Sequence, residues 1–124
     1  MRKKLVIEKV ERKDRRLYLI NDHPPFSLEE ARPKGHMLVD SDHLSFIYIL
    51  ETDEDFIYVA IPYEFWNDVK QALAEEAAVV LKSGELELEL TSFKEELTYL
   101  IENIDGNANY GEQMEQAVKE IFLT

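Results

Sequence analysis

The most hydrophobic part of the chain consists of two short runs, residues 44–50 and 56–62, separated by the acidic stretch 51–55. Both runs are rich in β-branched and aromatic residues, so the pattern predicts a β-hairpin with an acidic turn. Side chains alternate between the two faces of a strand, so a hairpin with one solvent-exposed face carries polar residues at every second position. Almost none occur here. We therefore predict that this hairpin lies at the centre of a sheet and is covered on both faces.

Shorter runs on either side of this hairpin predict further strands. Alternation over residues 5–10, together with the apolar run 17–20, predicts a first hairpin that turns near Lys13 and Asp14. Residues 37–39 predict a short strand. Between them, residues 21–36 contain three prolines and a glycine, so a turn or a short strand over 27–31 is the most regular element that we expect there.

A third hairpin is predicted near the middle of the chain. Residues 78–82 and 85–90 flank Ser83 and Gly84, which supply turn chemistry. Leucine and glutamate alternate strictly over 85–90. This alternation is typical of a strand with its leucines on the core and its glutamates in water.

Apolar residues recur at helical spacing in three segments, two of which are C-terminal. The first follows Pro62, a residue that suits the start of a helix. The second begins with Ser92 and Glu95 at the spacing of a capping box, and Gly106 is predicted to end it. The segments are residues 63–76, 92–105 and 109–124.

The order of these elements predicts an α+β fold. Strands come first and helices follow with a late hairpin, which favours a largely antiparallel sheet of about six to seven strands in three hairpins, with three helices. A chain of 124 residues fits a single domain, 1–124. Helices on one face would leave the second face of the central hairpin bare. Either the sheet curls on itself or a second subunit covers it, and we favour a homodimer.

The charge distribution narrows the range of partners. The net charge is −12, yet the segment 1–16 carries eight basic side chains against three acidic ones. A strongly acidic field repels nucleic acid and anionic membranes, so neither is expected as a partner. The basic stretch could instead dock on acidic parts of its own fold or of a neighbour. The chain has no cysteine, and no apolar run is long enough for a signal peptide or a membrane span, so we expect a cytoplasmic protein.

Asp40, Asp42 and His43 form the densest group of reactive side chains. The two carboxylates could hold a divalent cation, with His43 as a ligand or a general base. The alternative is a turn in which Asp40 and Ser41 bond to the backbone and His43 begins a strand. Hard cations usually draw ligands from several segments, so we favour the turn. No metal site is therefore predicted.

The stretch between the second and third helices is a candidate recognition loop. Asn107, Asn109, Tyr110 and Glu112 offer donors and acceptors close together on a helical support. Oxygens at alternate positions resemble a calcium loop, but its sixth position is tyrosine and its twelfth is glutamine. The alternative is a tight interhelical connection in which Asn109 caps the third helix.

The remaining candidates have structural alternatives that we favour. Trp66, Tyr63 and Phe65 could line a small-molecule pocket, but aromatic residues at helical spacing are more often part of a core. The acidic stretch 51–55 is typical of a solvated hairpin tip. No glycine-rich phosphate loop or nucleophile motif occurs, so no cofactor is predicted.

Three segments together resemble a known family: MLVDSDHLSFIYILE (37–51), FIYVAIP (56–62) and YLIENIDGNANYGE (99–112). The chain is similar in them to short acidic proteins from bacilli, which are grouped as an uncharacterised protein family without an assigned activity. The resemblance implies a cytoplasmic protein and supplies no cofactor or catalytic residue. In that family the position of His43 is also filled by asparagine in place of histidine, which argues against catalysis by this histidine.

Two functions remain open on the sequence. The first is a non-catalytic, acidic binding or regulatory protein that acts as a homodimer and has a possible protein partner. The second is a small metal-assisted hydrolase that uses the Asp40, Asp42 and His43 group. We favour the first, because the sequence contains no recognisable catalytic constellation and its central hairpin is apolar on both faces.

Overall fold

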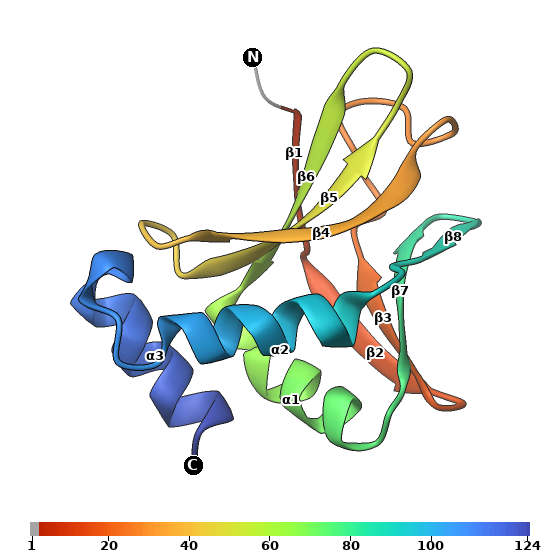
Figure 1. Cartoon of the computed structure of the whole chain (residues 1–124). Coiled ribbons are helices and arrows are strands. Elements are labelled where there is room, and N and C mark those ends of the chain that lie inside the picture. The colour runs from red at the N-terminus through yellow and green to blue at the C-terminus, as the bar shows by residue number, and fades with distance from the viewer. Residues whose placement is uncertain (1–2) are drawn as a thin grey trace.

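The computed structural model describes residues 3–124 and consists of two four-stranded sheets and three α-helices (Figure 1). Together the sheets and helices enclose one hydrophobic core. The strands are β1 (Lys3–Val6), β2 (Lys9–Lys13), β3 (Arg16–Ile20), β4 (Arg32–Asp40), β5 (Ser45–Glu51), β6 (Phe56–Pro62), β7 (Ala78–Ser83) and β8 (Leu86–Glu89). The helices are η1 (Tyr63–Phe65), α1 (Trp66–Ala74), α2 (Phe93–Ile104), η2 (Ala108–Tyr110) and α3 (Glu112–Phe122).

The predicted α+β class is confirmed, although eight strands form two sheets where one sheet of six to seven was expected. The first sheet has the order β1-β6-β5-β4, and the second has the order β2-β3-β7-β8. Four of the six strand pairings in the described chain are antiparallel; β1–β6 and β3–β7 are parallel. The central position of the β5–β6 hairpin is confirmed, because β4 and β1 flank it.

The chain changes sheets between β1 and β2. The alternation over residues 5–10 had predicted a single strand there. The Ile7 amide donates to the Ala60 carbonyl of the first sheet, and the next amide, Glu8, donates to the Ile20 carbonyl of the second, each at 2.9 Å. The predicted hairpin is therefore present only as β2–β3. Buried Asn21 fixes this corner, since its side-chain amide donates to the Val6 carbonyl at 2.9 Å.

Strand β4 is longer than predicted and begins at Arg32 instead of Met37. Pro33 obscured it in the sequence, but the structure accommodates the irregularity as a register shift between Pro33 and Met37. Gly35 lies within this shift and adopts a φ of 70°, which glycine tolerates. A residue pattern of period two cannot reveal a strand whose register changes in the middle.

Two predicted helix caps are wrong. Ser92 adopts a φ of 59° and makes no side-chain cap. The neighbouring Glu96 bonds to another element, accepting from the Met37 amide of β4 at 3.2 Å. Helix α3 begins after Gly111, whereas Asn109 lies inside η2. The segment before α2 is hydrogen-bonded to another part of the fold. The segment before α3 forms a 3₁₀ turn of its own.

Trp66 is a core residue, as predicted. It is fully buried, its ring centroid lies 4.5 Å from that of Phe46, and its indole N–H donates to the Ile61 carbonyl at 2.9 Å. The leucine–glutamate alternation of β8 also appears as predicted, with glutamates exposed and leucines turned toward the core. In Figure 1 the three helices lie together, and α2 runs along β4. Within residues 3–124 no helix is long and apolar enough to cross a membrane.

Candidate functional site

The first sheet has two apolar faces that differ in their surroundings. Side chains such as Tyr48 and Val59 point into the core that the helices share. Their strand neighbours point the other way, and we call that second surface the outer face. Cross-strand register aligns its members in rows, with Leu38 beside Ile47, Ile47 beside Ala60, and Ala60 beside Val6. The apolar residues of the outer face are Val6, Leu38, Ile47, Ile49, Phe56, Tyr58 and Ala60.

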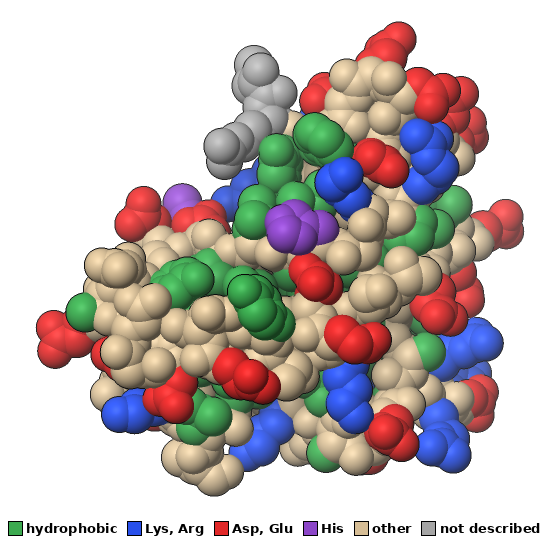
Figure 2. Space-filling view, in the orientation of Figure 1, with side chains coloured by type: hydrophobic (Ala, Val, Ile, Leu, Met, Phe, Trp, Pro, Cys, Tyr) green, Lys and Arg blue, Asp and Glu red, His purple; other side chains and the backbone are tan. Residues whose placement is uncertain are grey.

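The outer face is only partly covered. Its centre is shielded by neighbouring side chains, since Ile47 and Ile49 are each 6 % exposed. Its margins are open to solvent, with Val6 and Phe56 42 % exposed and Leu38 40 % exposed. Hydrophobic side chains are visible at the surface over the upper sheet in Figure 2, with charged groups beside them. Large apolar side chains exposed together mark binding surfaces more often than isolated ones do.

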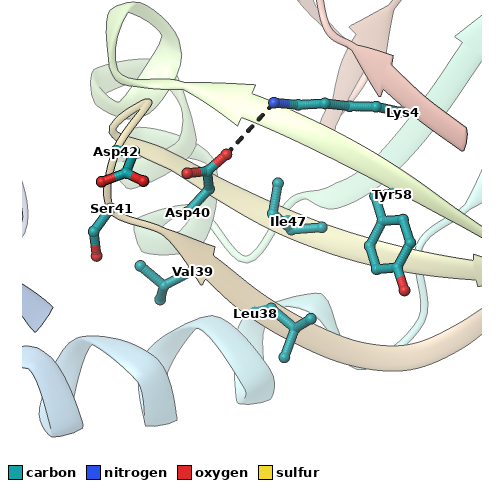
Figure 3. A pocket seen from close by; sticks show the side chains of 8 residues that line it. All are labelled: Lys4, Leu38, Val39, Asp40, Ser41, Asp42, Ile47 and Tyr58. Atoms are coloured by element: carbon teal, nitrogen blue, oxygen red, sulfur yellow. Dashed lines mark hydrogen bonds and ion pairs between the residues drawn. The ribbon is translucent and has the colours of Figure 1, made fainter. Parts of the chain in front are cut away.

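A shallow hollow of about 450 Å³ lies on the outer face (Figure 3). Its apolar side is formed by Leu38, Ile47 and Tyr58, and its polar side is formed by Lys4 and the turn after β4. Figure 3 shows Asp40 directed toward Lys4, while Ser41 and Asp42 lie farther along the turn. The hollow therefore combines an aliphatic and aromatic floor with one ion pair at its edge.

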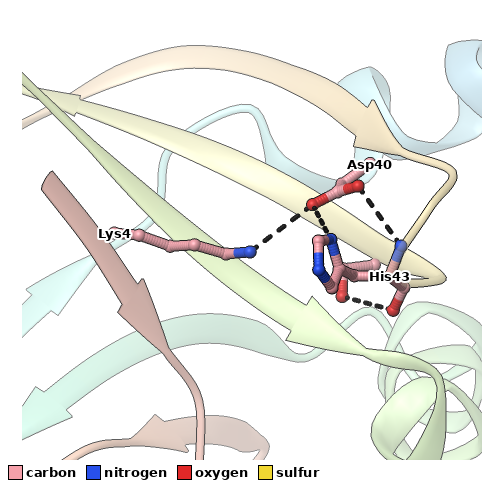
Figure 4. Close-up of polar contacts among 4 residues, drawn as sticks. Lys4, Asp40 and His43 are labelled. Atoms are coloured by element: carbon pink, nitrogen blue, oxygen red, sulfur yellow. Dashed lines mark hydrogen bonds and ion pairs between the residues drawn. The ribbon is translucent and has the colours of Figure 1, made fainter. Parts of the chain in front are cut away.

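Asp40 is the centre of the polar contacts (Figure 4). One carboxylate oxygen lies 3.4 Å from Lys4 Nζ and 2.9 Å from His43 Nδ1, and the other accepts from the His43 amide at 3.3 Å. The predicted turn bond to Asp40 is therefore present, but His43 lies within the turn, and the strand begins at Ser45 instead of at His43. The structure brings Asp40 and His43 together, but Asp42 does not join them. Lys4 was missed because it lies 36 positions away on a strand whose parallel pairing has no local signal.

These contacts set the ionisation of Asp40. Burial alone raises the pKa of its carboxyl group. The hydrogen bonds from the side chain and backbone of His43, and the charges of His43 and Lys4, outweigh this effect and lower the pKa below the ordinary 3.8. A carboxyl group with a lowered pKa stabilises the fold above its unfolded-state pKa. That stabilisation is lost as the pH falls through the folded-state value.

We predict that His43→Ala raises the pKa of Asp40 more than Lys4→Ala does. His43→Ala removes a side-chain hydrogen bond as well as charge and keeps only the backbone amide bond, whereas Lys4 supplies charge at a longer distance. Carboxyl ¹³C shifts of Asp40, followed by NMR from pH 2 to 6, report this directly. An equal rise in both variants would mean that charge, not hydrogen bonding, controls the carboxyl group.

Asp40, Asp42 and His43 are not arranged as a metal centre. Within residues 3–124, no group of three or more His, Asp or Glu side chains is placed to hold a metal ion. Hard cations require several oxygen ligands, and both Asp40 oxygens already accept hydrogen bonds from His43. Nothing in this arrangement favours a metal site, which the metal-assisted hydrolase would require, over a structural turn.

The candidate recognition loop is partly used by the fold itself. The Asn107 side chain accepts from the Asn109 amide at 3.0 Å and so caps η2, and half-buried Tyr110 packs against the core. Glu112 is exposed at the start of α3. Of these four loop residues, Glu112 lines a concave surface.

That concave surface is a groove of about 410 Å³, which we call the α3 groove. It lies between one side of α3 and the residues Leu44 and Tyr63. The Tyr63 hydroxyl donates to Glu120 at 3.1 Å, and this hydrogen bond, with desolvation and the charge of Glu120, raises the pKa of the tyrosine. The groove has no signature in the sequence, because Leu44 and Tyr63 are far from α3 in the chain. The lining residues are Leu44, Tyr63, Glu112, Gln113, Gln116, Ala117 and Glu120.

The structure combines an acidic chain with an α+β fold, a hollow on the outer face of the first sheet, a groove beside α3 and no assembled metal centre among residues 3–124. The model of a family of unknown function, UPF0738, matches residues 5–122, so the chain belongs to that family. The resemblance noted in the sequence is thereby confirmed. No solved structure matches the chain.

Several curated relatives from Geobacillus and Bacillus are named UPF0738 proteins. One from Geobacillus sp. (strain WCH70) is 77 % identical over 124 residues, which is the whole of both chains. One from Geobacillus kaustophilus is 52 % identical over 123 residues, covering 99 % of this chain and 98 % of its own. One from Bacillus mycoides is 42 % identical over 123 residues, covering 99 % of this chain and 100 % of its own.

Proposed function

We propose that this chain is a non-catalytic binding protein that acts as a homodimer through the outer face of its first sheet. The observation that carries the proposal is the open apolar margin of that face, formed by Val6, Leu38 and Phe56 on three different strands. Covering these side chains would remove apolar surface from water, and this is the main favourable term in association. They surround Ile47 and Ile49, which are already buried, so the apolar area left for a partner to cover is this margin.

The charges on the outer face favour a second copy of the chain as the occupant. Two chains that each carry −12 repel one another over most of their surface. On the outer face two lysines lie beside acidic side chains: Lys4 pairs with Asp40, and Lys34 pairs with Glu51 at 3.7 Å. Lys34 Nζ also lies 5.5 Å from the centre of the Phe56 ring. These lysines reduce the repulsion between identical chains on this face.

A dimer of this kind is isologous, since the same patch serves both partners. Each outer face is apolar at its centre and carries both signs of charge toward its edges, so it is compatible with itself. Face-to-face packing of two sheets places them about 10 Å apart with interdigitating side chains. Such packing would cover the margins that the helices leave open.

We predict that the wild-type protein has about twice the 14.5 kDa mass of one chain in solution, and that Leu38→Glu has the mass of one chain. The new carboxylate would be buried without a partner in a dimer, but it would be solvated in a monomer because Leu38 is 40 % exposed. Light scattering coupled to gel filtration, at two protein concentrations, measures the masses.

Leu123→Glu is the matched control. Leu123 is 45 % exposed, close to the value for Leu38, but it follows α3 and does not lie on the outer face. The control is expected to remain a dimer. A wild-type mass of one chain at both concentrations would overturn the dimer, and a dimer that survives Leu38→Glu would place the interface elsewhere.

A further inference from the structure

The α3 groove is a second surface with binding character, separate from the outer face. Its floor is apolar, formed by Leu44, the ring of Tyr63 and buried Ala117. Leu44 adopts a φ of 44°, an uncommon conformation for a leucine, and the Tyr63 amide donates to its carbonyl at 3.0 Å. The two residues that face α3 across the groove are therefore held together by the backbone.

The walls of the groove combine charge with hydrogen-bonding capacity. Glu112 and Glu120 contribute carboxylates from positions two helical turns apart, and both are exposed. Between them, the exposed amides of Gln113 and Gln116 provide donors and acceptors. No lysine or arginine is among the lining residues, so the groove is negatively charged over an apolar floor.

We infer that the α3 groove binds a basic segment of a protein partner in which lysine or arginine stands next to an apolar residue. The apolar side chain would lie over Leu44 and Tyr63, the cation would reach Glu112 or Glu120, and the glutamine amides would bond to the segment's backbone. The same carboxylates oppose phosphate, so nucleic acid does not fit the groove. This inference rests on the proposed binding function and names the chemistry of the partner.

The fold prepares this surface in two ways. Glu120 already accepts from the Tyr63 hydroxyl, which fixes one carboxylate at the wall before any partner arrives. Tyr63 in turn packs edge-on against Trp66, with ring centroids 5.3 Å apart. Because the side chains of Tyr63 and Glu120 are already held in place, they lose little conformational entropy when a partner binds, which lowers the entropic cost of association.

The test uses a capped peptide of alternating lysine and leucine as the probe and backbone-amide NMR of the full chain as the readout. Shift changes are expected around Leu44, Tyr63 and α3. The double variant Glu112→Gln with Glu120→Gln is expected to raise the dissociation constant about fivefold to tenfold, because each exposed charge pair contributes modestly. Glutamine keeps the size of both side chains and can still accept from Tyr63.

The matched control is Glu95→Gln with Glu102→Gln, which removes two exposed charges from α2 and leaves the groove intact. It is expected to bind as the wild type does. Equal weakening in both double variants, or shift changes spread over the acidic surface, would overturn the inference by showing general attraction to a negative protein. Absence of shift changes would overturn it as well.

The same titration on Leu38→Glu separates this inference from the proposed dimer. The groove lies outside the outer face, so the peptide is expected to bind this variant with unchanged affinity whether or not the wild type dimerises. Loss of peptide binding in Leu38→Glu alone would assign the probe to the outer face and overturn the groove as its site.

Discussion

Trp66→Ala is expected to lower the free energy of unfolding by about 3–5 kcal/mol, because truncating a buried tryptophan removes its transfer free energy and leaves a cavity. Trp66 is fully buried at the first position of α1. Its ring packs against Phe46 of the first sheet at 4.5 Å and against Phe122 of α3 at 5.9 Å between centroids. One side chain thus connects a sheet to two helices.

The indole N–H adds to this effect. It donates to the Ile61 carbonyl at the end of β6, just before the chain turns into η1. In Trp66→Ala that carbonyl loses this hydrogen bond, and a single intramolecular hydrogen bond contributes about 0.5–1.5 kcal/mol net. Tyr63 packs edge-on against the Trp66 ring, so the same substitution is also expected to loosen the α3 groove.

Denaturant unfolding followed by circular dichroism measures this prediction, since the variant removes the one tryptophan of the chain and with it the fluorescence signal. Tyr99→Ala is the control, because Tyr99 is an aromatic residue of α2 that is 65 % exposed. Its expected change is within about 0.5 kcal/mol. If Trp66→Ala lost no more stability than this control, the core would have closed around the missing ring and the prediction would be wrong.

The fold class could be predicted because its signals are local. The β5–β6 hairpin, the β7–β8 hairpin and the helical spacing of α2 are each encoded in one short, continuous stretch of the sequence. The parallel pairings β1–β6 and β3–β7 join segments that are distant in the chain, and no short pattern encodes such pairs. The division into two sheets follows from these pairings, so it was missed with them.

The candidate sites show the same limit. Asp40 and His43 are close neighbours in the sequence, and the turn that joins them was predicted from it. Lys4 and the α3 groove depend on tertiary placement, which a single sequence does not display. The β5–β6 hairpin offered the most useful functional signal. Its lack of a polar face indicated an apolar surface beyond the core, and the open margins of the outer face agree with that expectation.

Tyr48→Phe is expected to lower the free energy of unfolding by about 1–3 kcal/mol, although it removes a single oxygen atom. The Tyr48 hydroxyl donates to the Thr91 carbonyl at 2.7 Å and accepts from the Gly35 amide at 3.1 Å. It therefore bonds the irregular part of β4 to the segment that leads into α2. Burial raises the pKa of this hydroxyl against the opposing effect of its hydrogen bonds, as expected for an enclosed phenol.

Tyr99→Phe, at an exposed position, provides the matched control and should leave stability unchanged, as denaturant unfolding would measure for both variants. Tyr48 points to the core side of β5, opposite to Ile47 and Ile49, so Tyr48→Phe is also expected to keep the wild-type mass in solution. Leu38→Glu is expected to do the reverse, changing the mass with little loss of monomer stability. If Tyr48→Phe altered the mass as well, the two faces of the sheet would be coupled, and the outer face could not be treated as an independent interface.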